Sequence, residues 1–402
     1  MVEIANRVEK IKSFQVMALL EKAKAMEASG RDVIHMEVGE PDFPTPPAVI
    51  AAGQQALSQG LTRYTPATGL PELRAAVALY YQQRYGVEIA PHRIVITPGA
   101  SGALGLVTGL LFNAGDGVLL ADPGYPCNSH FLHLLGAEPQ WVPTPADTAF
   151  QLTGKLVRDH WQENTRGVLV ASPSNPTGSL INMHDMLALK QAVDEREGVL
   201  VVDEIYQGLT YGADATTVLA MTHKHENLVV INSFSKYFGM TGWRLGWIVA
   251  PEQWVPHLDR MAQNFYLAPP TISQYAALAA FQPETIVVLE QQRMQLQERR
   301  DYLLQALPGV GFKIPVVPEG AFYIYADVSG ITDDSFQFCE QLLQETGVAI
   351  TPGNDFGHHT AQSHVRLAYT NEVEKLKEAV QRIEAFLRVR NKHVYEIKGH
   401  DI

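Results

Sequence analysis

The sequence has few cysteines, no excess of positive charge and no long apolar run, and each absence excludes a class of protein. Its two cysteines, Cys127 and Cys339, lie far apart and offer neither a disulfide framework nor the spacing of metal ligands. The net charge of -12 argues against nucleic acid or an anionic membrane as partner, because both require basic patches. No apolar run approaches the length of a membrane span, and the chain does not start like a signal peptide. We therefore expect a cytoplasmic protein with no nucleic-acid and no membrane partner.

The chain is long enough for more than one domain and follows an α/β pattern. Its 402 residues, 46% of them hydrophobic, can bury a large core, and the length indicates two or three domains. Short β-branched runs alternate with helical patterns, which predicts a mostly parallel sheet wrapped by helices. The expected strands are 93–97, 118–121, 167–171, 199–203, 228–231 and 244–249. The first five each run into a polar turn, and in open α/β sheets such turns converge on one crevice.

The pattern changes after about residue 290, where we expect a smaller α+β domain. In chain order, a charged helix, a strand, a helix, a second strand and an amphipathic helix are expected at 289–304, 322–326, 335–345, 363–368 and 371–387. A helix at 15–29 and a strand at 33–36 are expected to pack on this domain. The predicted division is an N-terminal arm with part of the small domain (1–45), a large domain (46–288) and a small C-terminal domain (289–402).

Lys236 lies in the most informative segment, Ser233-Phe234-Ser235-Lys236, directly after an apolar strand. A Schiff base needs an amine that loses its proton near neutral pH, which burial or a nearby charge such as Arg244 favours. The hydroxyls of Ser233 and Ser235 and the guanidinium of Arg244 are suited to bind a phosphate dianion. The segment is typical of a site for an aldehyde cofactor with a phosphate tail, although on these residues alone Lys236 could equally be an ordinary solvated lysine.

Three further turns supply groups that such a cofactor needs, and each also has a purely structural explanation. After the first strand, Gly99, Ala100 and Ser101 begin an apolar helix whose N-terminus would bind a phosphate, but small residues there also permit tight packing of helix on sheet. After the second strand, Tyr125 could stack on an aromatic ring of the cofactor or simply pack. After the third, Asn175 stands in a stiff loop, where it could donate to a cofactor oxygen or cap a turn.

Asp203 ends a strand that is too apolar to be exposed on either face. A buried anion needs a cationic partner. A protonated pyridine nitrogen would be that partner, and its proton makes the ring an electron sink for carbanion chemistry. Tyr206, three residues further on, could reach the phenolate oxygen of the same ring.

No metal site is predicted, although two groups of residues suggest one. Asp203 and Glu204 could bind magnesium, but no phosphate-loop lysine accompanies them. His358, His359 and His364 lack a matching cluster of carboxylates or cysteines. We therefore interpret these histidines as surface or packing residues.

Five motifs follow one another over most of the chain: Gly-Glu-Pro-Asp-Phe at 39–43, Tyr-Thr-Pro-Ala-Thr-Gly at 64–69, Ser-Asn-Pro-Thr-Gly at 174–178, Asp-Glu-Ile-Tyr at 203–206 and Ser-Phe-Ser-Lys at 233–236. Together they resemble the class I/II aminotransferases, a fold type I family that uses pyridoxal 5′-phosphate. The resemblance implies a large domain with a mostly parallel seven-stranded sheet flanked by helices, and a smaller α+β domain. It also implies a homodimer with shared active sites.

The resemblance assigns a role to each candidate residue. Lys236 would form the aldimine with the cofactor and then move the substrate proton. Asp203 would pair with the pyridine nitrogen, while Asn175 and Tyr206 would bond the phenolate oxygen. Tyr125 would stack on the ring. The expected phosphate site comprises Gly99, Ala100, Ser101, Ser233, Ser235 and Arg244, completed by Tyr64 of the neighbouring subunit.

Substrate recognition is expected at Arg366, together with Gly39 and Asn175. Arg366 matches the arginine that binds the α-carboxylate, a planar anion that suits a guanidinium, and Gly39 matches the glycine whose backbone lies near that carboxylate. Some aspartate aminotransferases have a lysine where Ser101 stands, so its absence disfavours a dicarboxylate substrate. The side-chain pocket could draw on Phe14, Tyr64, Tyr125, Phe265 and Tyr266, which indicates neutral or aromatic amino acids.

We therefore expect an aminotransferase that moves an amino group from an L-amino acid to a 2-oxo acid. Two alternatives keep the cofactor: a carbon–sulfur β-lyase and an enzyme similar to 1-aminocyclopropane-carboxylate synthase. A third alternative is a non-catalytic regulatory domain that follows a DNA-binding segment. The acidic net charge and the short segment before residue 39 argue against it.

Overall fold

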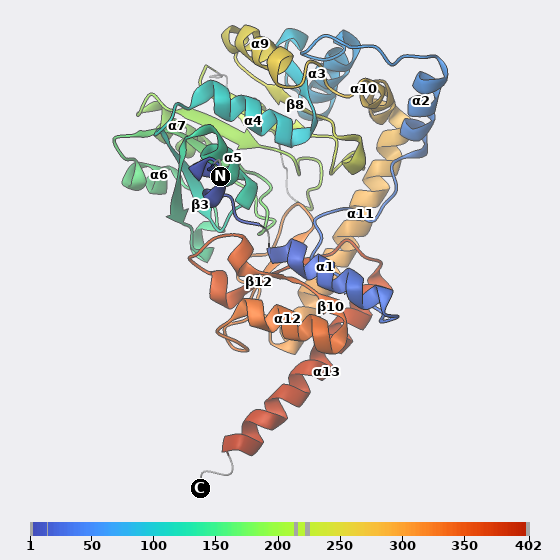
Figure 1. Cartoon of the computed structure of the whole chain (residues 1–402), viewed down its shortest axis with the longest axis vertical. Helices are drawn as coiled ribbons and strands as arrows, with labels where there is room; N and C mark the ends of the chain where they lie inside the picture. Colours follow the sequence, from blue (N-terminus) through green and yellow to red (C-terminus); the bar gives the residue numbers. More distant parts are fainter. Residues whose placement is uncertain (1–2, 14, 213–215, 222–225, 399–402) are drawn as a thin grey trace.

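A seven-stranded sheet forms the centre of the larger part of the computed structural model, which describes residues 3–13, 15–212, 216–221 and 226–398 (Figure 1). The strand order is β2-β8-β7-β6-β5-β3-β4, and β8 runs antiparallel to both of its neighbours while the other pairs are parallel. The strands are β2 (Ile94–Thr97), β3 (Gly117–Asp122), β4 (Glu138–Pro143), β5 (Thr165–Ala171), β6 (Val199–Asp203), β7 (Leu228–Ser233) and β8 (Gly246–Val249). The predicted α/β class with a mostly parallel seven-stranded sheet is confirmed.

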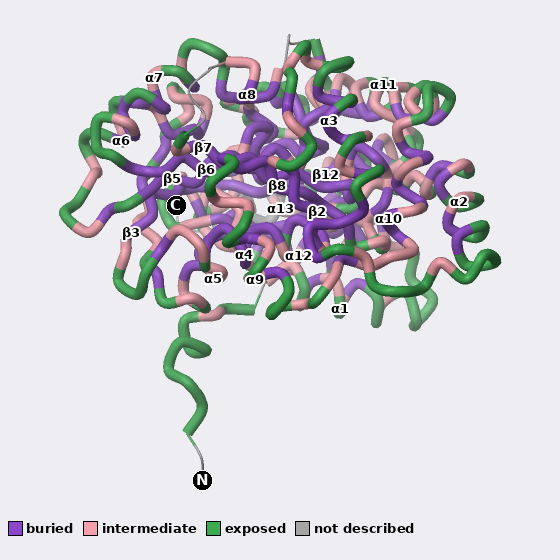
Figure 2. Tube along the Cα trace, turned by 90° about the horizontal axis from the view of Figure 1, so that it is seen from above, coloured by how far each residue is buried: buried purple, intermediate pink, exposed green. Residues whose placement is uncertain are grey.

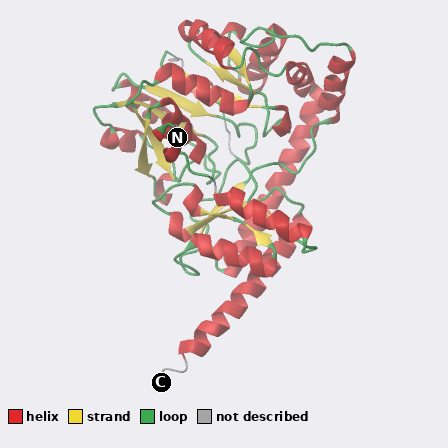
Figure 3. Ribbon diagram, in the orientation of Figure 1, coloured by secondary structure: helices red, strands yellow, loops and turns green. Residues whose placement is uncertain are grey.

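Helices cover both faces of this sheet, which explains why its central strands are apolar throughout. In β6, Leu200 and Val202 belong to one apolar cluster and Val201 belongs to the other. Figure 3 shows helices on both sides of the strands, and Figure 2 shows the strands as the buried interior. The first cluster includes residues of α2 (Pro47–Ser58), α3 (Pro71–Tyr85), α6 (Gly154–His160), α7 (Met183–Asp194), α8 (Val218–Met221) and α10 (Thr271–Leu278), and the second includes residues of α4 (Gly99–Leu111), α5 (Pro126–Leu135) and α9 (Val255–Phe265).

Two strands of this sheet differ from the sequence-based expectation. The strand expected at 244–249 begins only at Gly246, because Arg244 closes a 3₁₀ turn and has a φ of 51°. The sequence pattern missed β4, an edge strand that pairs with β3 alone and contains Pro139 and Pro143. Proline is tolerated at a sheet edge but argues against a strand when only the sequence is read.

The remaining strands form two small sheets beside the N-terminal and C-terminal helices. β9 (Tyr323–Asp327), β12 (His364–Ala368) and β11 (Thr351–Pro352) are antiparallel, and β1 (Ile34–His35) pairs in parallel with β10 (Val348–Ala349). Figure 1 shows α11 running from the larger sheet's helices down to this region, from which α13 projects. The helices here are α1 (Gln15–Ala28), α11 (Pro283–Ala306), α12 (Ser335–Thr346) and α13 (Val373–Lys398). The predicted boundary at residue 288 lies inside α11, and the division into three segments stays a prediction.

The ends of five strands position the candidate site. Thr97, Asp122, Ala171, Asp203 and Ser233 are the last residues of β2, β3, β5, β6 and β7, and each leads into a turn on the same edge of the sheet. Among the described residues, no helix is both long and apolar enough to cross a lipid bilayer.

Candidate active site

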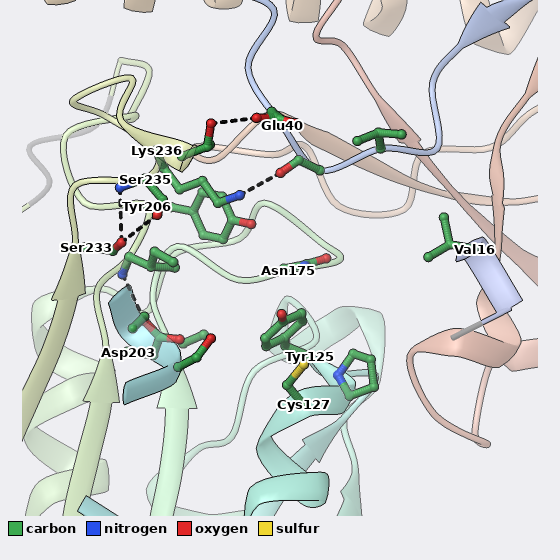
Figure 4. A pocket seen from close by; sticks show the side chains of 18 of the residues that line it. Val16, Glu40, Tyr125, Cys127, Asn175, Asp203, Tyr206, Ser233, Ser235 and Lys236 are labelled. Carbon is green, nitrogen blue, oxygen red and sulfur yellow. Dashed lines mark hydrogen bonds between the residues drawn. The ribbon is translucent and has the colours of Figure 1, made fainter. Parts of the chain in front are cut away.

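A cavity of about 500 Å³ lies where the strand ends of the large sheet meet α1 and the smaller sheets (Figure 4). Most of the residues predicted for the site line it: Gly39, Ala100, Ser101, Tyr125, Asn175, Asp203, Tyr206, Ser233, Ser235, Lys236, Arg244 and Arg366. Two residues predicted to bind the cofactor phosphate do not, and one of them, Tyr64, was expected at the phosphate of the neighbouring subunit. Gly99 lies under the guanidinium of Arg244, and Tyr64 is 81% exposed outside the cavity. The structure therefore brings together residues that are separated by more than half of the sequence.

Lys236 presents its amine to the cavity. Its Nζ donates a hydrogen bond to the carbonyl oxygen of Gly39 at 2.6 Å. Burial lowers the pKa of this amine to about 8; the carboxylate of Glu40 raises it, and the positive charges of Arg366 and Arg244 lower it. Near physiological pH, Lys236 is therefore neutral far more often than an ordinary lysine, as an amine nucleophile or proton acceptor must be.

Asp203 and Glu204 are adjacent buried carboxyl groups with different surroundings. Asp203 lines the cavity and accepts a hydrogen bond from the backbone N–H of Ile205 at 3.0 Å, and burial raises its pKa to about 6. Glu204 instead accepts hydrogen bonds from the hydroxyl and amide of residues 217 and 218, and burial raises its pKa to about 7. Of these two carboxyl groups, only Asp203 is placed to meet a cation in the cavity, whereas Glu204 binds the backbone and side chain at positions 217 and 218.

The start of α4 and the segment after β7 form a cradle of polar groups. Ser233 donates to the hydroxyl of Ser235 at 2.9 Å, and Arg244 contacts the same Ser235 hydroxyl at 3.4 Å. Gly99 has a φ of 71°, and a Cβ there would lie 2.5 Å from Nη2 of Arg244. Glycine at this position therefore allows the guanidinium to lie over the N-terminus of α4, whose first turn includes Ser101.

Arg366 is 5% exposed and has one unsatisfied donor. Its Nη1 donates to Oδ1 of Asn175 at 2.9 Å, and its Nη2 donates to the carbonyl oxygen of Glu37 at 2.5 Å. The rings of Tyr323 and Phe356 stack on the guanidinium at 4.3 and 4.8 Å. Its buried Nε has no hydrogen-bond partner among the described residues. A buried charged donor without a partner is unfavourable, so this group is suited to an anionic ligand.

Tyr323 belongs to the site but was not predicted. Its hydroxyl bonds the hydroxyl of Tyr206 at 2.9 Å, and a Cβ on Gly39 would lie 2.3 Å from it. The glycine of the 39–43 motif thus makes room for Tyr323. The sequence gives no signal for this contact, because Tyr323 reads as an ordinary aromatic residue of a small strand.

The side-chain pocket differs from the one predicted. Tyr125 lines the cavity, whereas Phe265 is 61% exposed and Tyr266 packs on the apolar cluster beneath α9. Phe14 lies outside the described residues. Residues of α1 that the sequence did not single out line the cavity instead: Val16, Met17 and Leu20.

The histidines do not form a metal site with other residues in the described ranges, where no group of three or more histidine, cysteine or acidic side chains could hold a metal ion. The backbone amides of His358 and His359 donate to the carboxylate of Asp122. His364 is buried and stacks on Tyr325 with ring centroids 4.8 Å apart. His358 and His359 are exposed, whereas the contacts of His364 are those of a packing residue.

The chain belongs to the class I and II aminotransferases, whose family model matches residues 31–383. It is 40% identical to the valine–pyruvate aminotransferase of Mycobacterium tuberculosis over 93% of this chain and 96% of the relative. It is 33% identical to the aspartate aminotransferase of Thermotoga maritima over 96% of this chain and 100% of the relative. A solved aminotransferase from Mycobacterium tuberculosis superposes with a TM-score of 0.93 at 38% identity, covering 97% of this chain and 100% of that one.

The aspartate aminotransferase of Thermus thermophilus, solved with maleate, has a TM-score of 0.90 at 33% identity and covers 97% of this chain and 100% of its own. The protein is therefore an aminotransferase of fold type I, in a family that uses pyridoxal phosphate. Neither the lyase, the synthase nor the regulatory alternative is favoured by these relatives.

Proposed function

We propose that the cavity binds pyridoxal 5′-phosphate and that Lys236, Asp203 and Arg366 carry the transfer of an amino group from an L-amino acid to a 2-oxo acid. The observation that supports this most is the convergence of a partly neutral amine, a buried carboxyl and a buried arginine in one cavity.

The residues fit the parts of this cofactor. Ser233, Ser235 and Arg244, with the N-terminus of α4, are suited to hold the phosphate. Asp203, buried without a cationic hydrogen-bond partner of its own, is suited to the protonated ring nitrogen. Because Asn175 uses Oδ1 to accept from Arg366, its amide nitrogen is the group available to donate to the ring oxygen, next to Tyr206.

When bound, pyridoxal phosphate supplies a carbonyl that takes up the amino group and a ring that withdraws electrons from the substrate α-carbon. Lys236 is proposed to bind the cofactor through Nζ and, once displaced by substrate, to carry the proton of the α-carbon. Arg366 orients the substrate through its carboxylate, which gives the unpaired Nε a partner. Tyr125, which lines the cavity, is proposed to stack on the cofactor ring.

The reaction is tested by its balance of products. With an L-amino acid donor and a 2-oxo acid acceptor, each donor consumed should yield one new 2-oxo acid and one new amino acid. A lyase would release ammonia instead, and a synthase would leave the acceptor unchanged. Among the relatives, one is named for valine and pyruvate and several for aspartate, so both donors belong in the first panel.

Alanine in place of Arg366 is expected to lower kcat/KM for amino acids without preventing cofactor loading. Removing one partner of a charge-assisted contact that leaves the other charge buried costs about 2–5 kcal/mol, which corresponds to roughly 30-fold to several thousand-fold. Amines that lack a carboxylate should react almost equally well with both enzymes, because they never use the contact. Equal losses for amino acids and simple amines would show that Arg366 has only a structural role.

Loading of cofactor-free protein should depend on pH with a midpoint near the pKa of Lys236. Only the neutral amine attacks a carbonyl, and burial lowers the pKa of Lys236 to about 8. The rate of loading, followed by absorbance, should therefore rise with pH and level off above about 8. A midpoint near 10.4, the ordinary lysine value, would contradict a desolvated amine.

We also propose a homodimer in which Tyr64 reaches the phosphate of the partner subunit. This rests on the family resemblance and on the 81% exposure of Tyr64, which lies outside the cavity of its own chain. Mixed dimers of Lys236→Ala and Tyr64→Ala chains should contain one site with both native residues and so recover native cofactor affinity at half of the sites. No recovery on mixing would place Tyr64 outside any shared site. A cytoplasmic location stays a prediction.

A further inference from the structure

Helix α1 turns one of its faces to the cavity. Leu19 and Ala23, four residues apart, are buried in the apolar core. Val16 and Leu20 have the same spacing on the neighbouring face and line the cavity, together with Met17. Figure 4 shows Val16 at the start of α1, across the cavity from Lys236 and Asp203. One wall of the cavity is therefore aliphatic.

Two further apolar side chains line the cavity, and the described part of this chain provides no additional cation there for a second carboxylate. They are Leu104 of α4 and Phe131 of α5. Among the described residues that line the cavity, the cations are Lys236, Arg244 and Arg366, and the proposed function uses all three. Two glutamates also line it, at positions 37 and 40. A substrate with an acidic side chain would lose water there without gaining a cationic partner from this chain, which is unfavourable.

Asp355 connects α1 to this cavity. Its carboxylate accepts hydrogen bonds from the first two backbone amides of α1, those of Gln15 and Val16, at 2.8 and 2.7 Å. It thereby caps the helix from a segment 340 residues away. The next residue, Phe356, stacks on the guanidinium of Arg366. The position of the aliphatic wall is thus tied to the group that binds the substrate carboxylate.

We propose that Val16, Met17, Leu20 and Phe131 form a side-chain subsite that selects amino acids with uncharged, apolar side chains, and that Asp355 is the positioning residue that holds α1 over it. This inference rests on the proposed aminotransfer. It assigns the enzyme to aliphatic or aromatic donors rather than to aspartate or glutamate.

The first test compares donors on the loaded enzyme. L-Valine, L-leucine and L-phenylalanine should exceed L-aspartate in kcat/KM by at least about 100-fold, since one methylene in an apolar pocket already contributes roughly 10–200-fold. The Met17→Arg variant should raise the ratio for aspartate over valine at least about 10-fold by supplying a cation. The matched control is Ala18→Arg, an exposed position on the same helix, which should leave the ratio unchanged.

Binding without turnover gives an independent readout of the same subsite. The loaded enzyme should bind 4-methylpentanoate more tightly than succinate. Met17→Arg should reverse this order of affinity or reduce the difference between the two Kd values. Aspartate as the best donor of the unmodified enzyme, with tight succinate binding, would overturn the subsite while leaving aminotransfer intact. Failure of every donor would instead overturn the proposed function.

The second test addresses Asp355 with Asp334 as its matched control. Asp334 caps α12 in the same way, through the backbone amides of Phe336 and Gln337, but does not line the cavity. Asp355→Ala should raise KM for leucine about 10-fold or more while changing KM for alanine little, because the alanine side chain is too short to reach the wall. Asp355→Asn should raise KM for leucine less than Asp355→Ala does, since one side-chain oxygen remains to accept a hydrogen bond from α1.

Helix position is read directly by limited proteolysis. In Asp355→Ala, trypsin should cut α1 after the exposed Lys24 faster than in the unmodified enzyme, and leucine analogues should protect less. Asp334→Ala should lower stability by a similar amount, but it should change neither the rate of trypsin cleavage in α1 nor the protection by leucine analogues. If Asp355→Ala and Asp334→Ala each change KM for leucine and KM for alanine by the same factor, Asp355 has only a structural role and the proposal for it is wrong.

Discussion

Alanine in place of Lys236 is expected to abolish turnover and covalent cofactor attachment together, while the protein stays folded. Proton transfer by a positioned side chain contributes roughly 10²–10⁴-fold, and Lys236 is also proposed to form the covalent link, so we expect kcat to fall by more than about 10⁴-fold. The fold should survive, because the amine contributes one hydrogen bond, to the carbonyl of Gly39, and its burial is itself unfavourable.

The site of attachment is measured by borohydride reduction of the loaded enzyme followed by peptide mapping. Lys236 should carry the label, and no labelled peptide should appear in the Lys236→Ala protein. Lys190 is a matched control, since it is buried on α7 but paired with Asp194 at 2.5 Å. Its alanine variant should lose stability and keep the label. A label on any other lysine would rule out the assignment of Lys236.

The second large effect is expected for Asp203→Asn, which keeps the shape of the side chain and removes its charge. Cofactor should still bind, but removal of the substrate α-proton should slow by several orders of magnitude, because the ring nitrogen loses the anion that keeps it protonated. Stopped-flow measurement with α-deuterated donor separates this step from release of product. Near-normal rates would mean that another group serves the ring nitrogen.

Although Asp203→Asn should lower activity, it should not lower the stability of the cofactor-free protein. Burial raises the pKa of Asp203 from an ordinary value of 3.8 to about 6 in the cofactor-free fold. The folded state therefore holds this proton more tightly than the unfolded state. The contribution of Asp203 to the free energy of unfolding falls as pH rises from 3.8 to about 6, and it stays low at higher pH. At neutral pH the cofactor-free asparagine variant should melt no lower than the unmodified protein. Glu204→Gln, which changes a carboxyl outside the cavity, is the control for activity and should keep most of it.

The local sequence pattern predicted those parts of the site where a strand and its following turn are continuous, whereas Gly39 and Arg366 were predicted only through the family resemblance. Asp203 and Lys236 stand at or just after the ends of apolar runs, so a local pattern places them at the carboxyl edge of a sheet. Asn175 and Ser101 follow strands in the same manner. The seven-stranded sheet was predictable for the same reason, except at β4, whose prolines and single neighbour leave no strand-like pattern.

The missed parts depend on contacts between distant segments. Tyr323 meets Tyr206 across 117 residues, and Asp355 meets Val16 across 339. Nothing in the short pattern around either residue specifies its partner, because α1 and the small strands are brought there by tertiary packing. Tyr64 lies outside the cavity of its own chain, as its predicted role at the phosphate of the partner subunit requires, and that role stays a prediction.

The continuity of α11 limits how this enzyme can be recombined with its relatives. Leu289 and Leu296 are each 1% exposed within one unbroken helix, so a chimaera joined at residue 288 would place its junction in the middle of packed turns. The C-terminal part also takes a strand from the beginning of the chain, through the amide of Ile34 bonded to the carbonyl oxygen of Gly347 at 2.8 Å. An exchange of substrate preference between family members would therefore have to transfer the segment from α1 to β1 together with the segment from the start of α11 onward, and also the side chain at Phe131 of the proposed subsite.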